Sequence, residues 1–175
     1  MFAACAMLAA YAQAATVGWS MAGANAFAGD KYMFFIEGQN NASITTITAL
    51  LDAGTDVSSY AYGSGVLASN GAATMAPAAS GKTLDAGTYT GFFVLFDSDA
   101  PVAGESQYVV ISGQANMTKS IAATTANASF AAGNVSSIVN NTANWASYGA
   151  AVPEPTSGLL MLVGLGALAL RRRRA

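Results

Sequence analysis

The sequence predicts a mainly β fold: an antiparallel, sandwich-like single domain with one or two short helices. Short runs of aromatic and β-branched residues recur along the chain, separated by stretches rich in Gly, Asn and Asp, which favour turns. Ser, Thr, Gly and Asn are abundant, which suits strands joined by polar loops. Aromatic runs at such intervals need two sheet faces to bury them, so two packed sheets are expected. An α+β arrangement is the alternative.

The first two strands are expected at Thr16–Met21 and Lys31–Glu37. Both are short aromatic and β-branched runs, and the residues between them are mostly Gly, Ala and Asn. This pattern is typical of neighbouring strands, so the two are predicted to pair with each other.

A short helix is expected at about 43–52, where apolar residues recur at helical spacing. Ser43 or Asn41 is available as its N-cap. Gly54 is placed to end it.

The strongest predicted strand is Thr88–Phe96, which has Asp- and Gly-containing turns at its ends. Gln107–Ser112 is expected to pair with it through a long hairpin loop. Ser69–Gly81 is predicted to be a loop of small residues. Lys119–Ala132 fits both an alanine-rich helix and a threonine-rich strand, so both assignments stay open.

Composition and charge exclude several classes of function. Between its two ends the chain has no arginine and more acidic residues than lysines, so nucleic acid is not an expected partner. Histidine is absent, which removes the usual general base and the usual transition-metal ligand. The single cysteine, Cys5, lies in the N-terminal apolar segment, so the domain is expected to have no disulfide or zinc–thiolate site. Enzymatic activity is therefore not expected, and no cofactor is predicted.

The C-terminal tail, residues 152–175, has three parts. It begins with Pro153, Glu154 and Pro155, whose prolines favour an extended backbone that a protease can reach. An uncharged apolar run follows, made of Gly158, Leu159, Leu160, Met161, Leu162, Val163, Gly164, Leu165, Gly166, Ala167, Leu168, Ala169 and Leu170. The tail then carries a basic cluster of Arg171, Arg172, Arg173 and Arg174.

The apolar run predicts a short transmembrane helix. It would be roughly 20 Å long, against a hydrocarbon core of about 30 Å, so the bilayer would have to thin and the arginine stems reach the interface. Positive charge at its C-terminal end favours a cytoplasmic basic cluster and places the preceding domain outside.

Together, Pro153-Glu154-Pro155, the apolar run and the arginine cluster resemble a PEP-CTERM sorting signal. This C-terminal signal occurs on exported bacterial proteins that an exosortase processes, and the resemblance is confined to residues 152–175. It implies that a membrane-embedded exosortase cleaves near Pro153-Glu154-Pro155. The domain would then be released to the envelope, the cell surface or an exopolysaccharide matrix. A permanent tail anchor is the alternative.

Residues 1–14 predict a signal peptide. They are apolar and rich in small residues, and Ala12 and Ala14 fit the A-x-A pattern of signal-peptidase cleavage. The exported domain is therefore expected to be residues 15–151. No Lys or Arg precedes the apolar stretch, so the true start is expected farther upstream. A buried N-terminal helix is the alternative.

Two groups of acids are candidate sites. Asp97, Asp99 and Glu105 follow a strong strand and could supply oxygen ligands to calcium, although their spacing is not that of an EF-hand. Solvated turn acids are the alternative. The same acids, or Asp52 with Asp56, could form a glycosidase pair, but neighbours in one loop are not thereby placed on opposite sides of a sugar.

Aromatic side chains are candidates for a sugar-stacking platform, because aromatic faces bind pyranose faces. The candidates are Trp19, Tyr32, Tyr60, Tyr62, Tyr89, Tyr108, Trp145 and Tyr148, and core packing is the alternative for most of them. The sequence thus predicts an exported, non-enzymatic envelope or matrix protein that signal peptidase and an exosortase process. A carbohydrate-binding module at the cell surface is the alternative function.

Overall fold

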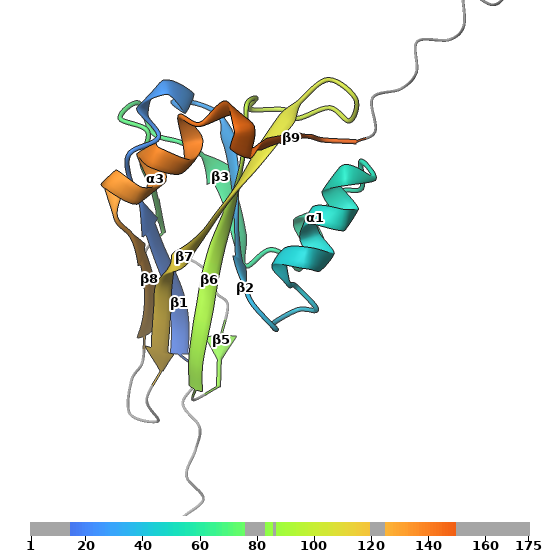
Figure 1. Ribbon diagram of the computed structural model, residues 1–175. Coiled ribbons are helices and arrows are strands. Elements are labelled where there is room, and N and C mark those ends of the chain that lie inside the picture. The colour runs from blue at the N-terminus through green and yellow to red at the C-terminus, as the bar shows by residue number, and fades with distance from the viewer. Residues whose placement is uncertain (1–14, 76–82, 86, 120–124, 150–175) are drawn as a thin grey trace, which may run out of the picture.

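The structure, a computed structural model, describes residues 15–75, 83–85, 87–119 and 125–149 (Figure 1). Within these residues the fold is mainly β, with two sheets and two short α-helices, which confirms the predicted class. The strands are β1 (Ala15–Met21), β2 (Lys31–Ile36), β3 (Gly63–Val66), β4 (Ala73–Met75), β5 (Thr83–Leu84), β6 (Gly87–Phe96), β7 (Gln107–Lys119), β8 (Thr125–Phe130) and β9 (Trp145–Ser147). The helices are α1 (Ile44–Asp52) and α3 (Ala132–Val139), with the 3-10 turns η1 (Asn25–Phe27), η2 (Ser58–Tyr60) and η3 (Thr142–Asn144). The apolar helix predicted at 158–170 lies outside the described residues.

One sheet has five strands in the order β3-β2-β6-β7-β9, and each neighbouring pair in it is antiparallel. The other has four strands arranged about β1, which pairs antiparallel with β4 and β5 and parallel with β8. The sheets are therefore mainly antiparallel, and β1–β8 is a parallel pair that the sequence did not predict. Both strands lead to the same end of the sandwich, where the segments after them pack together. A side chain at Gly23, after β1, would collide with the carbonyl oxygen of Ala132, after β8.

The two sheets enclose the larger hydrophobic core. Alternate residues of β1 and of the facing β2 point into it, namely Val17, Trp19, Met21, Tyr32, Phe34 and Ile36. Figure 1 shows α3 across one end of the two sheets, and its Val135 and Val139 are buried in the same core. The helix therefore closes the open end of the sandwich.

A second core lies between the five-stranded sheet and α1, which covers the other face of that sheet (Figure 1). Its residues include Met33, Phe35, Phe92, Val94 and Phe96 from the sheet, and Ile47 and Leu51 from the helix. β2 and residues 91–96 of β6 are therefore buried on both faces. This explains why these segments are continuous apolar runs and do not alternate with polar residues.

The predicted pairing of the first two strands is wrong. β2 pairs with β3 and β6, whereas β1 belongs to the other sheet. The connection through η1 crosses from one sheet to the other, with left-handed glycines at Gly23 (φ 100°) and Gly29 (φ 93°). Because β1 faces β2 across the core, the rings of Trp19 and Phe34 stack with centroids 4.8 Å apart.

The predicted helix is confirmed as α1. Ser43 is its N-cap, because its Oγ accepts a hydrogen bond from the backbone N–H of Thr46 at 3.0 Å. The backbone N–H of Ile44 also donates to Glu37 Oε2 at 3.3 Å. Gly54, with φ of 71°, follows the end of the helix as predicted.

The strongest predicted strand and its partner are confirmed as β6 and β7. The segment 119–132, for which helix and strand were both open, contains β8 and the first residue of α3. The predicted loop at 69–81 contains β4, which is short and depends on pairing with β1. Such a strand has no sequence signal of its own.

Candidate functional site

Two adjoining hollows lie between η1 and α3, and together they are called the α3 groove. The first has a volume of about 290 Å³ and is lined by Phe27, Asp97, Gln107, Asn140, Thr142 and Trp145. The second, of about 470 Å³, is lined by Gly23, Asn25, Gly133, Ser136 and Asn140. Asn140 lines both hollows, so they are neighbours on the surface.

Phe27 and Trp145 form the apolar wall of the first hollow. Their rings are stacked, with centroids 4.8 Å apart and planes inclined by 28°. Both are half-buried against the core between the sheets. Trp145 Nε1 donates a hydrogen bond to the carbonyl oxygen of Val139 at 2.8 Å, so the indole is held in one orientation.

The groove also contains side chains that can bind polar ligands. Asp97 Oδ1 accepts a hydrogen bond from the backbone N–H of Gln107 at 2.8 Å, and the two backbones pair again at 3.1 Å, closing the hairpin loop. The side chains of Gln107, Asn140 and Thr142 are exposed and make no side-chain hydrogen bond to another described residue. Amide and hydroxyl groups are therefore available to a ligand.

The charge near the groove is negative. The pKa of Asp30 is raised, first by partial burial and then by the negative charges of Asp97 and Asp99. Asp97 and Asp99 therefore add negative charge around the Asp30 carboxylate. This negative charge disfavours the binding of an anionic ligand.

The structure does not assemble the candidate calcium site. The described residues contain no group of three acidic, His or Cys side chains placed to share a metal ion, although Asp97, Asp99 and Glu105 are all among them. Instead, Asp97 bonds to the backbone of Gln107, and the backbone N–H of Glu105 donates to the carbonyl oxygen of Val102 at 3.1 Å. These contacts organise the loop between β6 and β7.

Asp52 and Asp56 each bond within the fold. Tyr108 donates its hydroxyl hydrogen to Asp52 Oδ1 at 2.7 Å, and the pKa of Tyr108 is raised by its burial and by this carboxylate. The Asp56 carboxylate accepts hydrogen bonds from the backbone N–H and the hydroxyl of Ser58, each at 2.9 Å. These bonds lower the pKa of Asp56.

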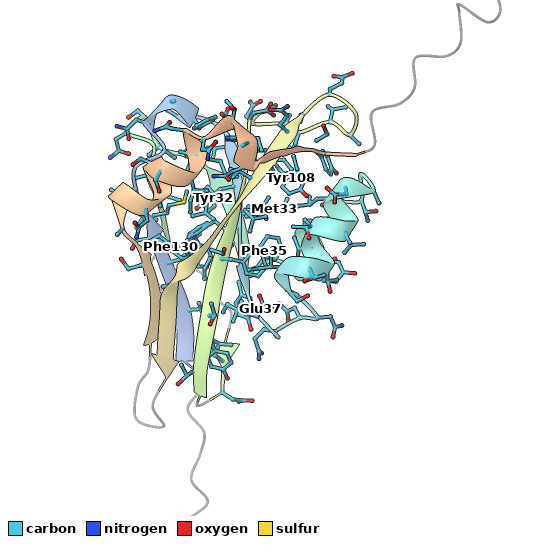
Figure 2. All side chains as sticks on the ribbon, viewed as in Figure 1. Tyr32, Met33, Phe35, Glu37, Tyr108 and Phe130 are labelled. Atoms are coloured by element: carbon cyan, nitrogen blue, oxygen red, sulfur yellow. The ribbon has the colours of Figure 1, made fainter. Side chains whose placement is uncertain are left out.

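Most of the candidate aromatic residues pack into the two cores. Trp19, Tyr32, Tyr62 and Tyr108 are buried, and Tyr60, Tyr89, Trp145 and Tyr148 are half-buried. Figure 2 shows Tyr32 and Phe130 on the side of the five-stranded sheet that faces β1, with Met33, Phe35 and Tyr108 on the side of α1.

Trp145 is the predicted aromatic residue that lines the α3 groove, whereas its partner Phe27 was missed. Phe27 is a lone aromatic residue in the Gly-, Ala- and Asn-rich segment between β1 and β2. That signal could have identified it. The roles of Gln107, Asn140 and Thr142 have no comparable signal, because polar residues are common throughout the chain.

The last described residues are fixed beside α1. Gly149 N–H donates to the carbonyl oxygen of Leu51, and Tyr148 N–H donates to that of Ser106, both at 2.8 Å. Gly149 has φ of 81°, and a Cβ there would lie 3.0 Å from the Cβ of Ala103. The chain therefore passes from the folded domain into its tail at a point held by hydrogen bonds to two different segments.

The predicted processing residues lie outside the described residues: Ala12, Ala14, Pro153, Glu154, Pro155, the run 158–170 and Arg171–Arg174. None of the helices formed by the described residues is both long enough and apolar enough to cross a membrane. The PEP-CTERM protein-sorting motif matches residues 151–174, which confirms the resemblance found in the tail. No curated protein and no solved structure matches the chain.

Proposed function

We propose that this chain is an exported bacterial protein of the cell envelope or extracellular matrix, and that an exosortase cleaves it near Pro153-Glu154-Pro155. The PEP-CTERM motif at residues 151–174 is the observation that carries the proposal. In the proposed sequence of events, signal peptidase first cuts after Ala14. The apolar run then holds the protein in the membrane until the exosortase acts.

The folded domain and the proposed cleavage site are close in the sequence. Gly149 is hydrogen-bonded to Leu51, and Pro153 follows it by four residues. Cleavage near Pro153 would therefore leave the described domain intact.

The proposed role is non-enzymatic. Asp52 and Asp56, one of the two sets of acids considered for catalysis, are hydrogen-bonded to Tyr108 and Ser58. One contact joins α1 to β7, and the other lies at the start of η2. These structural contacts support a non-enzymatic role for both carboxylates.

Intact-mass spectrometry of the protein recovered from the envelope and medium of its native host tests the sorting proposal. We expect a mass that begins at Ala15 and ends near Pro153. A mass that retains Arg171–Arg174 in all fractions would replace sorting with a permanent anchor. A Pro153→Ala, Pro155→Ala double variant should keep its tail, whereas a Thr156→Ala control in the same segment should be processed normally.

A second candidate function is carbohydrate binding at the cell surface. The specific observation in its favour is the pair of half-buried rings, Phe27 and Trp145, beside exposed amide and hydroxyl groups. Retention of the processed protein on immobilised polysaccharide, compared with an uncoated matrix, tests this function. Elution at the same volume from both would argue against it.

A further inference from the structure

We infer that the α3 groove binds a neutral polysaccharide chain, with one sugar ring against Phe27 and Trp145 and the next beyond Asn140. This inference rests on the proposed carbohydrate-binding function and assigns its site and its ligand class. It is independent of the sorting proposal, because it concerns residues of the folded domain alone.

The shape of the groove favours a chain over a single sugar. Its two hollows, of about 290 and 470 Å³, lie on either side of Asn140, which lines both of them. A single compact ligand would fill one hollow and leave the other to solvent. A linear oligosaccharide places successive rings in both hollows and buries more of its surface.

The two hollows offer different chemistry. Phe27 and Trp145 line the first hollow, and because the two rings stack on each other, a pyranose can place its C–H face against the outer face or edge of the pair. The second hollow is lined by small residues, among them Gly133 and Ser136. Asn140 stands between them with an exposed amide that can both donate to and accept from sugar hydroxyls.

Sugar hydroxyls need donors and acceptors at the rim of an aromatic site. The side chains of Gln107, Asn140 and Thr142 make no side-chain hydrogen bond to another described residue. Asp97 uses Oδ1 to accept from the backbone of Gln107, which fixes the direction of its carboxylate. The side chains of Gln107, Asn140 and Thr142 therefore line the same hollow as the aromatic pair and remain available to hydrogen-bond a ligand.

Charge selects a neutral chain. Asp97 is the charged side chain of the first hollow, and the second hollow has none. Asp30 and Asp99 add negative charge nearby, since Asp97 and Asp99 both act on the Asp30 carboxylate. Uronate, sulfate or phosphate groups would be repelled, and neither hollow is lined by a lysine or arginine that could pair with them.

The walls of the groove are rigidly connected, so little ordering would be needed on binding. Gly23 adopts φ of 100° and lies against the backbone of Ala132, which joins the β1–η1 segment to the start of α3. The hydrogen bond from Trp145 Nε1 to Val139 holds the indole in position. A site that is already formed loses less conformational entropy when a ligand binds.

The test is affinity electrophoresis of the protein, in the form recovered from its native host, in native gels that contain a soluble neutral polysaccharide, namely β-glucan, galactomannan or xylan. Polygalacturonate serves as the anionic probe. We expect at least one neutral polymer to retard the wild-type protein and polygalacturonate to have no effect. Phe27→Ala should weaken binding about tenfold, and Asn140→Ala about two- to tenfold, as expected for lost stacking and one lost hydrogen bond.

Two matched controls separate a local effect from a general one. Tyr60→Ala removes a half-buried aromatic ring outside the groove, and Asn134→Ala removes an exposed amide from α3 that does not line it. Both should bind as the wild type does. Asn140 is exposed, so its variant should fold normally and gives a result even if Phe27→Ala unfolds.

Each remaining outcome overturns a defined part of the inference. Retardation of the wild type with equal retardation of Phe27→Ala and Asn140→Ala would leave carbohydrate binding standing and remove the groove as its site. Retardation by polygalacturonate alone would overturn the neutral ligand. No retardation by any polymer would overturn both the binding function and the groove.

Discussion

The ring of Trp19 stacks on that of Phe34 across the two sheets, and Gly63 leaves the space that the indole occupies. A Cβ at residue 63 would collide with Cη2 of Trp19, which is buried and has no room to move away. β3 therefore needs glycine here to lie against the core. The contact links β1 and β2, which belong to different sheets, with β3, which lies farther along the chain.

Gly63→Ala is expected to lower the free energy of unfolding by about 1–3 kcal/mol, because the added methyl group overpacks the core. Urea denaturation of the processed protein measures this. Gly133→Ala is the matched control, since a Cβ there meets nothing within 4 Å and the residue is helical. It should stabilise the protein by roughly 0.5–1 kcal/mol. Equal stability of Gly63→Ala and wild type would contradict the packing described for Trp19.

Ser43→Ala is expected to destabilise the protein by about 1 kcal/mol, because the backbone N–H of Thr46 loses its capping acceptor. Thr45→Ala changes an exposed hydroxyl two residues later in α1 and should stay within about 0.5 kcal/mol of wild type. Thermal or urea unfolding distinguishes the two. A Ser43 variant as stable as the Thr45 variant would show that the cap contributes nothing.

Tyr108→Phe is expected to cost about 1 kcal/mol at neutral pH through loss of the hydrogen bond to Asp52. The folded state raises the pKa of Tyr108 above the unfolded value of about 10. The protonated hydroxyl therefore contributes its full stabilisation to the folded state below about pH 10, and this stabilisation is lost as the pH rises further. Urea unfolding from pH 8 to 11.5 should therefore show a shallower alkaline loss in the variant.

Part of the alkaline loss should persist in Tyr108→Phe, because burial also raises the pKa of Tyr62 and of Tyr148. Tyr60→Phe removes a half-buried hydroxyl that does not bond to Asp52, so it is the control and should keep the wild-type stability at pH 7. If Tyr108→Phe loses stability above pH 10 as steeply as wild type does, the assigned role of the Asp52 contact is wrong.

Asp30→Asn is expected to raise the urea midpoint at pH 7 but not at pH 3. The raised pKa of Asp30 means that folding favours its protonated form, so the ionised carboxylate destabilises the folded state as the pH rises through that pKa. Asp85→Asn removes an equal charge at the opposite end of the sandwich, after β5, and should not reproduce the effect (Figure 1). An Asp30 effect of the same size at both pH values would rule out a titration origin.

The sequence by itself determined the features that depend on short stretches of chain. The tail at residues 151–174 was recognisable because its proline, apolar and arginine parts are consecutive. α1 was predicted together with its cap, because Ser43 and Gly54 act on the backbone next to them. β6 was predicted because its long run of aromatic and β-branched residues is bounded by turn residues at both ends, a pattern typical of a strand.

Only the tertiary structure decided which strands pair and which side chains meet. Several short runs have similar composition, so the local pattern favoured a pairing of β1 with β2. In the structure β2 pairs with β6 and is buried on both faces, and β1 lies in the facing sheet. The α3 groove has the same origin. Phe27 and Trp145 come from opposite ends of the domain, and they meet because both pack against one core, a contact between segments that no local sequence pattern specifies.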